Sequence, residues 1–206
     1  MTQQPAFPDA DTSLTLTGPA GVLEAVVEYP EADAEAAAQP VVAIVCHPLP
    51  TEGGTMNNKV VTMAARALRE LGITTVRFNF RGTGNSAGEF DEGEGERDDL
   101  RAVADWVRAA RPAAALWLAG FSFGAYVSIR ASAELQPAMP WLVVQGEEDE
   151  IVDPHAVYDW LEKLAPPQLT LVKMPACTHF FHGKLVDLRG VIKNTARHWL
   201  PAPANA

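Results

Sequence analysis

The sequence has few cysteines and few basic residues, and each shortage excludes a class of protein. Its two cysteines, Cys46 and Cys177, cannot form the disulfide framework of a small secreted protein. Lysine and arginine total 16 against 26 aspartates and glutamates, which gives a net charge of −10. The basic residues form no cluster that would bind phosphate groups, so we expect no nucleic-acid partner. We interpret the acidity as an aid to solubility.

Long apolar runs and targeting segments are also missing. No run approaches the roughly 20 residues that span a bilayer. The first residues, MTQQPAFPDADT, have neither the basic segment nor the apolar core of a signal peptide. These absences predict a cytoplasmic protein without a membrane partner. The 206 residues suit one domain, residues 1–206, and we expect residues 1–12 and 201–206 to fray at its ends.

The remaining sequence alternates between β-type runs and helical patterns. Residues 13–30 contain two β-type runs around a Gly- and Pro-containing turn, which predicts an antiparallel hairpin. Further strands are predicted at 41–46, 74–80, 115–120, 141–145 and 168–174, and helices at 57–72, 97–110, 124–135, 154–164 and 183–200. This alternation is typical of an α/β fold, in which a mostly parallel, doubly wound sheet carries helices on both faces.

One loop between a predicted strand and a predicted helix carries a candidate nucleophile. In such a sheet, functional groups gather on the loops at the carboxyl ends of the strands. The segment Gly120-Phe-Ser-Phe-Gly124 matches G-x-S-x-G, a turn so sharp that neighbouring side chains must be absent. The glycines leave that room and lift the serine hydroxyl above the sheet. We therefore predict that Ser122 is a nucleophile and not only a residue of a structural turn.

A serine nucleophile needs a base, and histidine is the natural choice. Of the five histidines, His179 follows the last predicted strand and lies downstream of the acid candidates. This position suits the chain order Ser, acid, His. His182 stays open as an alternative base, or as a residue that caps the last helix or faces solvent. We expect His155 and His198 on the surface.

The acid that orients the base is expected in the segment GEEDEIVDP, residues 146–154. Asp149 lies just past the end of the predicted strand and is the favoured candidate. Asp153 directly precedes a proline, which predicts that it is the N-cap of the next helix. The remaining carboxylates are predicted to form a solvated acidic rim: Glu147, Glu148 and Glu150.

Acyl transfer also needs backbone N–H groups that stabilise a developing oxyanion. The N–H of Phe123, next to the nucleophile, is the first predicted donor. A second is expected from the loop after residues 41–46, where Pro48 and Pro50 have no N–H to donate. Leu49 is therefore the nearest donor, and the segment Gly53-Gly54 is the alternative.

Together these residues resemble the α/β-hydrolase superfamily, and within it the small, lidless bacterial serine hydrolases similar to carboxylesterases and dienelactone hydrolases. Five segments carry the likeness in the family's order: HPLPTEGGTMNNKVV, VRFNFRGTGNSAGEF, LAGFSFGAYVSIR, WLVVQGEEDEIVDP and PACTHFFHGKL. The resemblance implies a Ser122–Asp149–His179 triad, an oxyanion hole that includes Phe123, and no cofactor. It also implies that residues 81–86 form a structural loop, so that Ser86 is not the nucleophile.

The sequence departs from the family pattern in two places. Leu49 stands where relatives often have histidine. Residues 123–140 accommodate one helix and its turns, so the strand that the family usually places before the acid-bearing strand is missing. We expect strand 141–145 to pair directly beside strand 115–120, because a gap would leave buried backbone groups unpaired.

The leading hypothesis is a serine hydrolase that cleaves a carboxylic ester or thioester through an acyl-Ser122 intermediate. Few residues remain to build a lid, so we expect a small-molecule substrate with a small or exposed acyl group. The oligomeric state, monomer or homodimer, stays open. The alternative from another class is a catalytically impaired binding or scaffold protein of the same fold.

Two further alternatives are weaker. Cys46, His47, Cys177, His179 and His182 could supply metal ligands, but zinc sites usually show tighter paired spacing. Gly82-x-Gly84-x-x-x-Gly88 could suggest a nucleotide site, but the spacing misses G-x-G-x-x-G. The acidic residues that follow would also repel a pyrophosphate.

Overall fold

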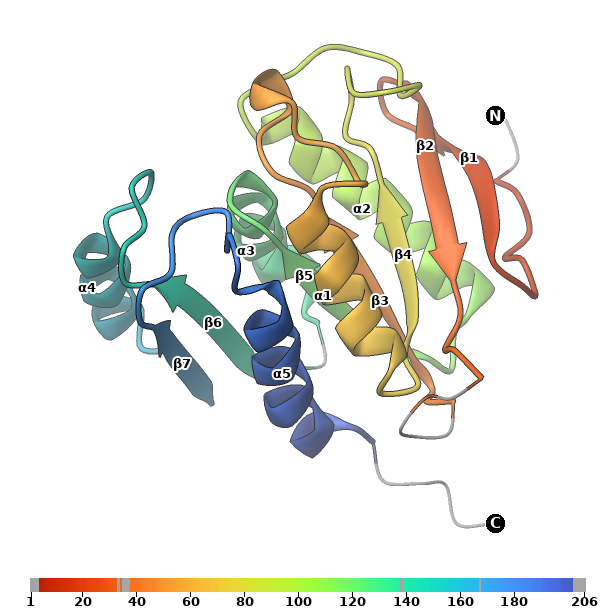
Figure 1. Cartoon of the computed structure of the whole chain (residues 1–206). Coiled ribbons are helices and arrows are strands. Elements are labelled where there is room, and N and C mark those ends of the chain that lie inside the picture. The colour runs from red at the N-terminus through yellow and green to blue at the C-terminus, as the bar shows by residue number, and fades with distance from the viewer. Residues whose placement is uncertain (1–3, 33, 35–37, 138, 167, 202–206) are drawn as a thin grey trace. The chain divides into compact units, whose positions relative to one another are not determined.

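The computed structural model describes residues 4–32, 34, 38–137, 139–166 and 168–201. Contacts divide the chain into two compact units, residues 1–138 and residues 139–206. Each unit has its own β-sheet and its own helices (Figure 1). No helix in the described part of the chain is long and apolar enough to cross a bilayer.

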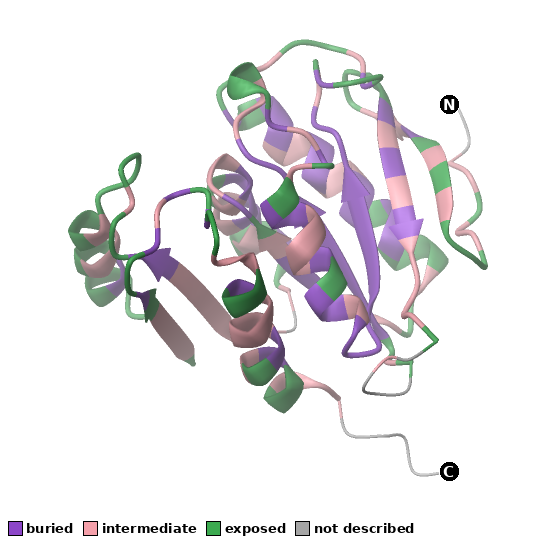
Figure 2. Cartoon of the chain, in the orientation of Figure 1, coloured by how far each residue is buried: buried purple, intermediate pink, exposed green. Residues whose placement is uncertain are grey.

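The first unit is built on a five-stranded sheet with the strand order β1-β2-β4-β3-β5. Its strands are β1 (Thr12–Gly18), β2 (Gly21–Glu28), β3 (Val41–Cys46), β4 (Thr74–Phe78) and β5 (Ala115–Gly120). β1 and β2 form the predicted antiparallel hairpin, and β3 pairs in parallel with both β4 and β5. Every residue of β3 and β4 is buried (Figure 2), which is typical of strands covered on both faces.

Three helices cover this sheet: α1 (Lys59–Arg69), α2 (Glu94–Ala110) and α3 (Phe123–Leu135). In Figure 1, α1 lies in front of the sheet and α2 behind it. Asn58 caps α1, because its side chain accepts a hydrogen bond of 2.9 Å from the N–H of Val60. α2 begins at Glu94 rather than at residue 97, because the Glu96 carboxylate accepts the N–H of Gly93 and closes the first turn.

Residues near the N-terminus are held against the first unit, which corrects the prediction that residues 1–12 fray. The rings of Phe7 and Trp106 stack with centroids 4.9 Å apart, and the Trp106 indole N–H donates to the Pro5 carbonyl. The Gln4 side chain donates to and accepts from the backbone of Thr17. An aromatic pair of this kind contributes about 0.5–1.5 kcal/mol beyond the area that it buries. The short, irregular N-terminal segment has no local sequence pattern that predicts such a contact. The predicted fraying of residues 1–3 and 202–206 falls outside the described residues.

The second unit contains two parallel strands, β6 (Trp141–Gly146) and β7 (Leu169–Met174), and two helices, α4 (Pro154–Leu164) and α5 (Leu185–Ala196). Asp153 caps α4 as predicted, because its carboxylate accepts the N–H of His155 at 3.0 Å. α5 contacts β6. It ends earlier than the predicted residue 200, because residues Arg197–Trp199 form a 3₁₀ turn.

The segment between α3 and β6 contains no strand in its described residues, as the sequence predicts. The expected pairing of β6 beside β5 would join the two units and stays a prediction. β6 and β7 form a sheet of their own, in register from Trp141 opposite Leu169 to Gly146 opposite Met174. The whole length of β6 thus finds backbone partners on β7, which a chain-length argument could not foresee.

Candidate active site

Ser122 lies between β5 and α3 in an unusual backbone conformation. Its φ is 54° and its ψ is −119°, in a region that side-chain-bearing residues rarely occupy. Such a conformation costs on the order of 1–3 kcal/mol and persists only where the surroundings enforce it. Although serine is a favoured helix N-cap, the Ser122 hydroxyl makes no capping hydrogen bond to α3. This is the backbone of a nucleophile elbow.

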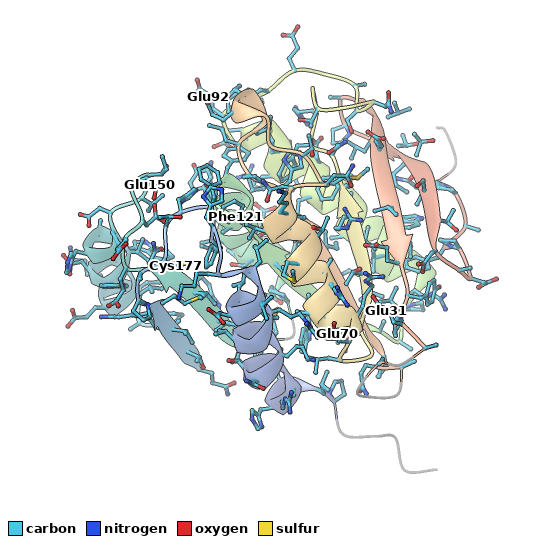
Figure 3. The ribbon with its side chains drawn as sticks, in the orientation of Figure 1. Glu31, Glu70, Glu92, Phe121, Glu150 and Cys177 are labelled. Carbon is cyan, nitrogen blue, oxygen red and sulfur yellow. The ribbon has the colours of Figure 1, made fainter. Side chains whose placement is uncertain are left out.

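Two glycines make the elbow sterically possible. A Cβ on Gly120 would lie 2.4 Å from the carbonyl carbon and oxygen of Gly124. A Cβ on Gly124 would lie 2.4 Å from the Cys46 carbonyl oxygen and 2.5 Å from that of His47. The N–H of Phe121 donates to the same Cys46 carbonyl at 3.1 Å (Phe121 is labelled in Figure 3). The elbow therefore packs directly on the backbone at the end of β3.

The two predicted oxyanion donors, Phe123 and Leu49, also belong to the first unit. Phe123 is the first residue of α3, so its N–H has no carbonyl one turn earlier. Within the described part of the chain, neither this N–H nor that of Leu49 has a hydrogen-bond acceptor. The alternative donors are occupied, because the N–H of Gly53 donates to Pro50 and that of Gly54 to Leu49, at 3.1 and 3.0 Å. This favours Leu49 over the glycines.

His47 is a buried residue of this loop that the sequence suggested only as a metal ligand. Its Nε2 accepts the N–H of Phe80 at 3.0 Å, and its Nδ1 lies 2.7 Å from the Pro48 carbonyl oxygen. Because an N–H can only donate, Nε2 carries no proton, and Nδ1–H donates to Pro48. Desolvation by burial lowers the pKa of His47 to about 4, although the bond to Pro48 opposes that shift. The ring is therefore neutral near pH 7.

The second unit brings together the predicted acid and base. Nδ1 of His179 lies 2.9 Å from Oδ2 and 3.1 Å from Oδ1 of Asp149. The two residues follow β6 and β7, and parallel neighbouring strands end at the same edge of their sheet. Because the carboxylate only accepts, Nδ1 of the neutral ring carries the proton, and Nε2 is the basic nitrogen.

The Asp149 carboxylate is held by further donors. Oδ1 accepts the N–H groups of Ile151 and Val152 at 2.9 and 2.8 Å, and Oδ2 accepts the Gln145 side-chain amide at 2.9 Å. Burial raises the pKa of Asp149, but the hydrogen bonds from Val152, His179, Ile151 and Gln145 outweigh it and leave the pKa below its ordinary value. The acid is thus kept ionised and fixed in orientation.

The carboxylates of the predicted acidic rim, Glu147, Glu148 and Glu150, are exposed, and Glu150 is in addition hydrogen-bonded to the histidine loop. The side chain is exposed, yet its Oε2 accepts the backbone N–H of His179 at 3.1 Å (Glu150 is labelled in Figure 3). The backbone N–H of Glu148 donates to Cys177 on the same loop at 3.1 Å. The sequence could not indicate which of three adjacent carboxylates turns back toward a loop 29 positions away.

The other histidines predicted for the surface or as an alternative base differ from His179 in exposure. His179 is only 6% exposed, whereas His155, His182 and His198 are all exposed. Within the described residues, no three His, Cys, Asp or Glu side chains are arranged to hold a metal ion. His47 is already committed through both ring nitrogens.

The glycine-rich loop after β4 is structural. The Ser86 hydroxyl donates to the Asn79 carbonyl at 2.7 Å and accepts the N–H of Glu24 at 2.9 Å. The Glu24 carboxylate accepts from the Asn79 amide and from both the backbone and the side chain of Asn85. A carboxylate therefore occupies the donors that a phosphate would need, which argues against the nucleotide alternative.

Comparisons with known proteins identify the family and the fold. The model of the family described as X-Pro dipeptidyl-peptidase (S15 family) matches residues 21–143. The structure of XC6422 from Xanthomonas campestris, described as an α/β serine hydrolase without a lid, has 60% sequence identity and a TM-score of 0.91 over 98% of this chain and 100% of that one. An α/β serine hydrolase homologue from Coxiella burnetii has 39% identity and a TM-score of 0.86 over 92% and 99% of the two chains.

A relative from Rickettsia prowazekii, the uncharacterised protein RP471, is 32% identical over 74% of this chain and 77% of its own length. The fold, the strained serine and these similarities lead to one assignment. The chain belongs to the α/β-hydrolase superfamily, in the family described as X-Pro dipeptidyl-peptidase (S15 family), and has the lidless architecture of the α/β serine hydrolases.

Proposed function

We propose that this hydrolase cleaves a carboxylic ester or thioester with a small or exposed acyl group through an acyl-Ser122 intermediate. The observation that carries the proposal is the Ser122 backbone, at φ 54° and ψ −119°, with a hydroxyl that does not cap the helix it precedes. A serine kept in a strained conformation at the end of a strand, without a capping role, is suited to nucleophilic attack.

In the proposed mechanism, the Ser122 oxygen attacks the substrate carbonyl carbon while Nε2 of His179 takes the hydroxyl proton. Asp149 holds Nδ1–H and stabilises the imidazolium that forms, as its hydrogen bond of 2.9 Å allows. The N–H groups of Phe123 and Leu49 stabilise the oxyanion. Collapse of the tetrahedral intermediate expels the alcohol or thiol, which takes the proton from His179.

Deacylation repeats these steps with water as the nucleophile. His179 takes a proton from water, hydroxide adds to the acyl carbon, and the Ser122 oxygen leaves with the proton that His179 returns. The cycle consumes one water and restores the enzyme, so it needs no cofactor.

The preference for esters over peptides is part of the proposal. The family match covers residues 21–143, which include Ser122, Phe123 and Leu49 but not Asp149 or His179. The matched region is thus the one that supplies the nucleophile and the oxyanion donors, which ester and amide hydrolysis share. An alkoxide or thiolate can leave without the full protonation that an amine requires. Ester and thioester hydrolysis therefore needs less precise proton transfer to the leaving group than peptide hydrolysis does.

A fluorophosphonate probe and a short substrate panel test the proposal. We expect the probe to label the wild type and not Ser122→Ala. We expect turnover of 4-nitrophenyl acetate and of an acetyl thioester, and at least about 100-fold lower kcat/KM on Gly-Pro-4-nitroanilide. Absent labelling of the folded wild type would favour the non-catalytic binding protein, and equal labelling of Ser122→Ala would overturn Ser122 as the nucleophile. Preferred cleavage of the X-Pro substrate would overturn the ester assignment.

A further inference from the structure

We infer that His47 is a positioning residue that orients the Leu49 N–H as an oxyanion donor by holding the Pro48 carbonyl. The inference rests on the proposed function. His47 does not touch substrate in this account, because both of its ring nitrogens are bonded to backbone groups of the first unit. It acts on the reaction through one peptide unit.

The Pro48 carbonyl and the Leu49 N–H belong to the same peptide group. The described residues contain no cis peptide bond, and in a planar trans peptide the C=O and the N–H point in opposite directions. Nδ1–H of His47 fixes the carbonyl at 2.7 Å and therefore also fixes the direction of the N–H. That N–H has no acceptor in the described part of the chain.

The next peptide group along the chain, between Leu49 and Pro50, is restrained as well. The Leu49 carbonyl accepts the N–H groups of Gly54 and Glu52 at 3.0 and 3.2 Å. Gly54 packs so closely that a Cβ there would lie 2.1 Å from the Pro48 oxygen and 2.6 Å from the Leu49 oxygen. The Pro48–Leu49 peptide therefore has little freedom to rotate while His47 holds Pro48.

The loop that carries this peptide starts on the elbow itself. Gly124, two positions after Ser122, lies so close to this loop that a Cβ on it would be 2.4 Å from the Cys46 carbonyl oxygen and 2.5 Å from that of His47. Leu49 follows His47 by two positions. The donor from this loop and the donor from Phe123 are thus built on backbones that touch each other.

His47 is itself fixed. It is fully buried, accepts the N–H of Phe80, and its ring centroid lies 4.8 Å from that of Phe80. Because burial keeps the His47 ring neutral near pH 7, the donor on Nδ1 and the acceptor on Nε2 persist there.

Two amide variants separate the two ring nitrogens. The amide of His47→Asn reaches the position of Nδ1 and can donate to Pro48, whereas the amide of His47→Gln reaches the position of Nε2 and can accept from Phe80. We expect His47→Gln to lose about 100-fold in kcat with KM changed less than about threefold, as for a displaced transition-state contact. We expect His47→Asn to stay within about tenfold of the wild-type kcat.

Inhibition by a boronic acid, whose tetrahedral adduct carries an oxyanion-like oxygen, gives a second readout. Its inhibition constant should rise in His47→Gln in parallel with the loss of kcat/KM, and much less in His47→Asn. If His47→Gln shows no cooperative unfolding transition, and so is not folded, Gly54→Ala replaces it as the test. The added Cβ displaces the Pro48–Leu49 peptide and should lower kcat with KM retained.

Equal loss of kcat in both amide variants, or wild-type kcat in a folded His47→Gln or Gly54→Ala protein, would overturn the inference. These outcomes differ from a failure of the proposed function, in which the wild type itself would neither turn over esters nor react with the fluorophosphonate.

Discussion

Two histidines of the chain illustrate how one residue type can have opposite roles. His47 is buried with both ring nitrogens on backbone groups, and burial holds its pKa near 4. His179 presents Nδ1 to a carboxylate, so its Nε2 is the nitrogen that can exchange a proton. The first arrangement suits a structural clamp, and the second suits a general base.

Asp149→Asn tests the acid at the residue scale. The amide would place a donor where the carboxylate accepts four hydrogen bonds, and it would favour the wrong tautomer of His179. We expect kcat for ester hydrolysis to fall about 10³- to 10⁴-fold. Asp153→Asn is the matched control, because asparagine is as good an N-cap as aspartate and the residue lies on the same loop. Equal activity of the two variants would contradict the assigned role of Asp149.

The buried His47 predicts a pH dependence of stability. Its pKa falls from about 6.5 in the unfolded chain to about 4 in the folded one, so between these values only the unfolded state binds the proton. The contribution is therefore complete above about pH 6.5 and is lost as the pH falls toward 4, by roughly 3 kcal/mol in total.

Urea unfolding between pH 7 and pH 4 measures this effect. The free energy of unfolding should fall more steeply with decreasing pH in the wild type than in His47→Gln, since the carboxylates and the other histidines are common to both proteins. Parallel pH profiles would show that His47 can be protonated in the folded state without penalty.

At the scale of elements, a close backbone contact joins the elbow to the end of β3. Gly124 at the start of α3 and the backbone of Cys46 and His47 approach so closely that only a hydrogen fits between them. This contact joins the helix that carries the proposed donor Phe123 to the loop that carries the proposed donor Leu49. The glycine thus serves the site through packing and not through a special φ.

Gly124→Ala tests this contact. Its Cβ would meet backbone oxygens at 2.4 and 2.5 Å, which cannot move aside as a flexible side chain could. We expect a loss of about 2 kcal/mol or more in the free energy of unfolding. Gly190→Ala is the control, because Gly190 lies inside α5 and its added Cβ would meet no described atom within 4 Å. There the change should stabilise by about 0.5–1 kcal/mol, since alanine is the better helix former.

The elements show which features a sequence can predict. The hairpin, the buried strand β3 and the helix α4 follow from local patterns of apolar residues, turns and caps, and the structure confirms them. Ser122, Asp149 and His179 were predictable as candidate site residues because they follow strand ends in a recognisable order. Their supporting residues were not: His47 bonds to Phe80 33 positions away, and Glu150 to His179 29 positions away. Such long-range contacts leave no local pattern, and neither does the choice of β7 as the partner of β6.

At the scale of the whole molecule, the two units hold different parts of the proposed chemistry. The first contains Ser122 and both proposed oxyanion donors, and the second contains the proposed acid and base, Asp149 and His179. The sheets of the two units also differ in how their strands are held. In the first unit, β3 and β4 each pair with two neighbouring strands and are buried throughout. In the described part of the second unit, β6 and β7 pair only with each other and are half-buried along most of their length.

Amide hydrogen-exchange rates in the full chain should therefore differ between the strands of the two units. Amides open by local fluctuations whose free energy rises with burial and with the number of cooperating hydrogen bonds. We expect the amides of β3 and β4 to exchange at least about tenfold more slowly than those of β6 and β7, after correction for intrinsic rates. Segment-resolved mass spectrometry at pH 7 measures both sets in one sample, and the amides of the exposed segment 9–11 supply the fast-exchanging reference. Equal protection of all four strands would contradict this expectation. It would mean that the chain opens as one cooperative body, and that β6 and β7 are as stable against local opening as β3 and β4 despite having fewer paired strands.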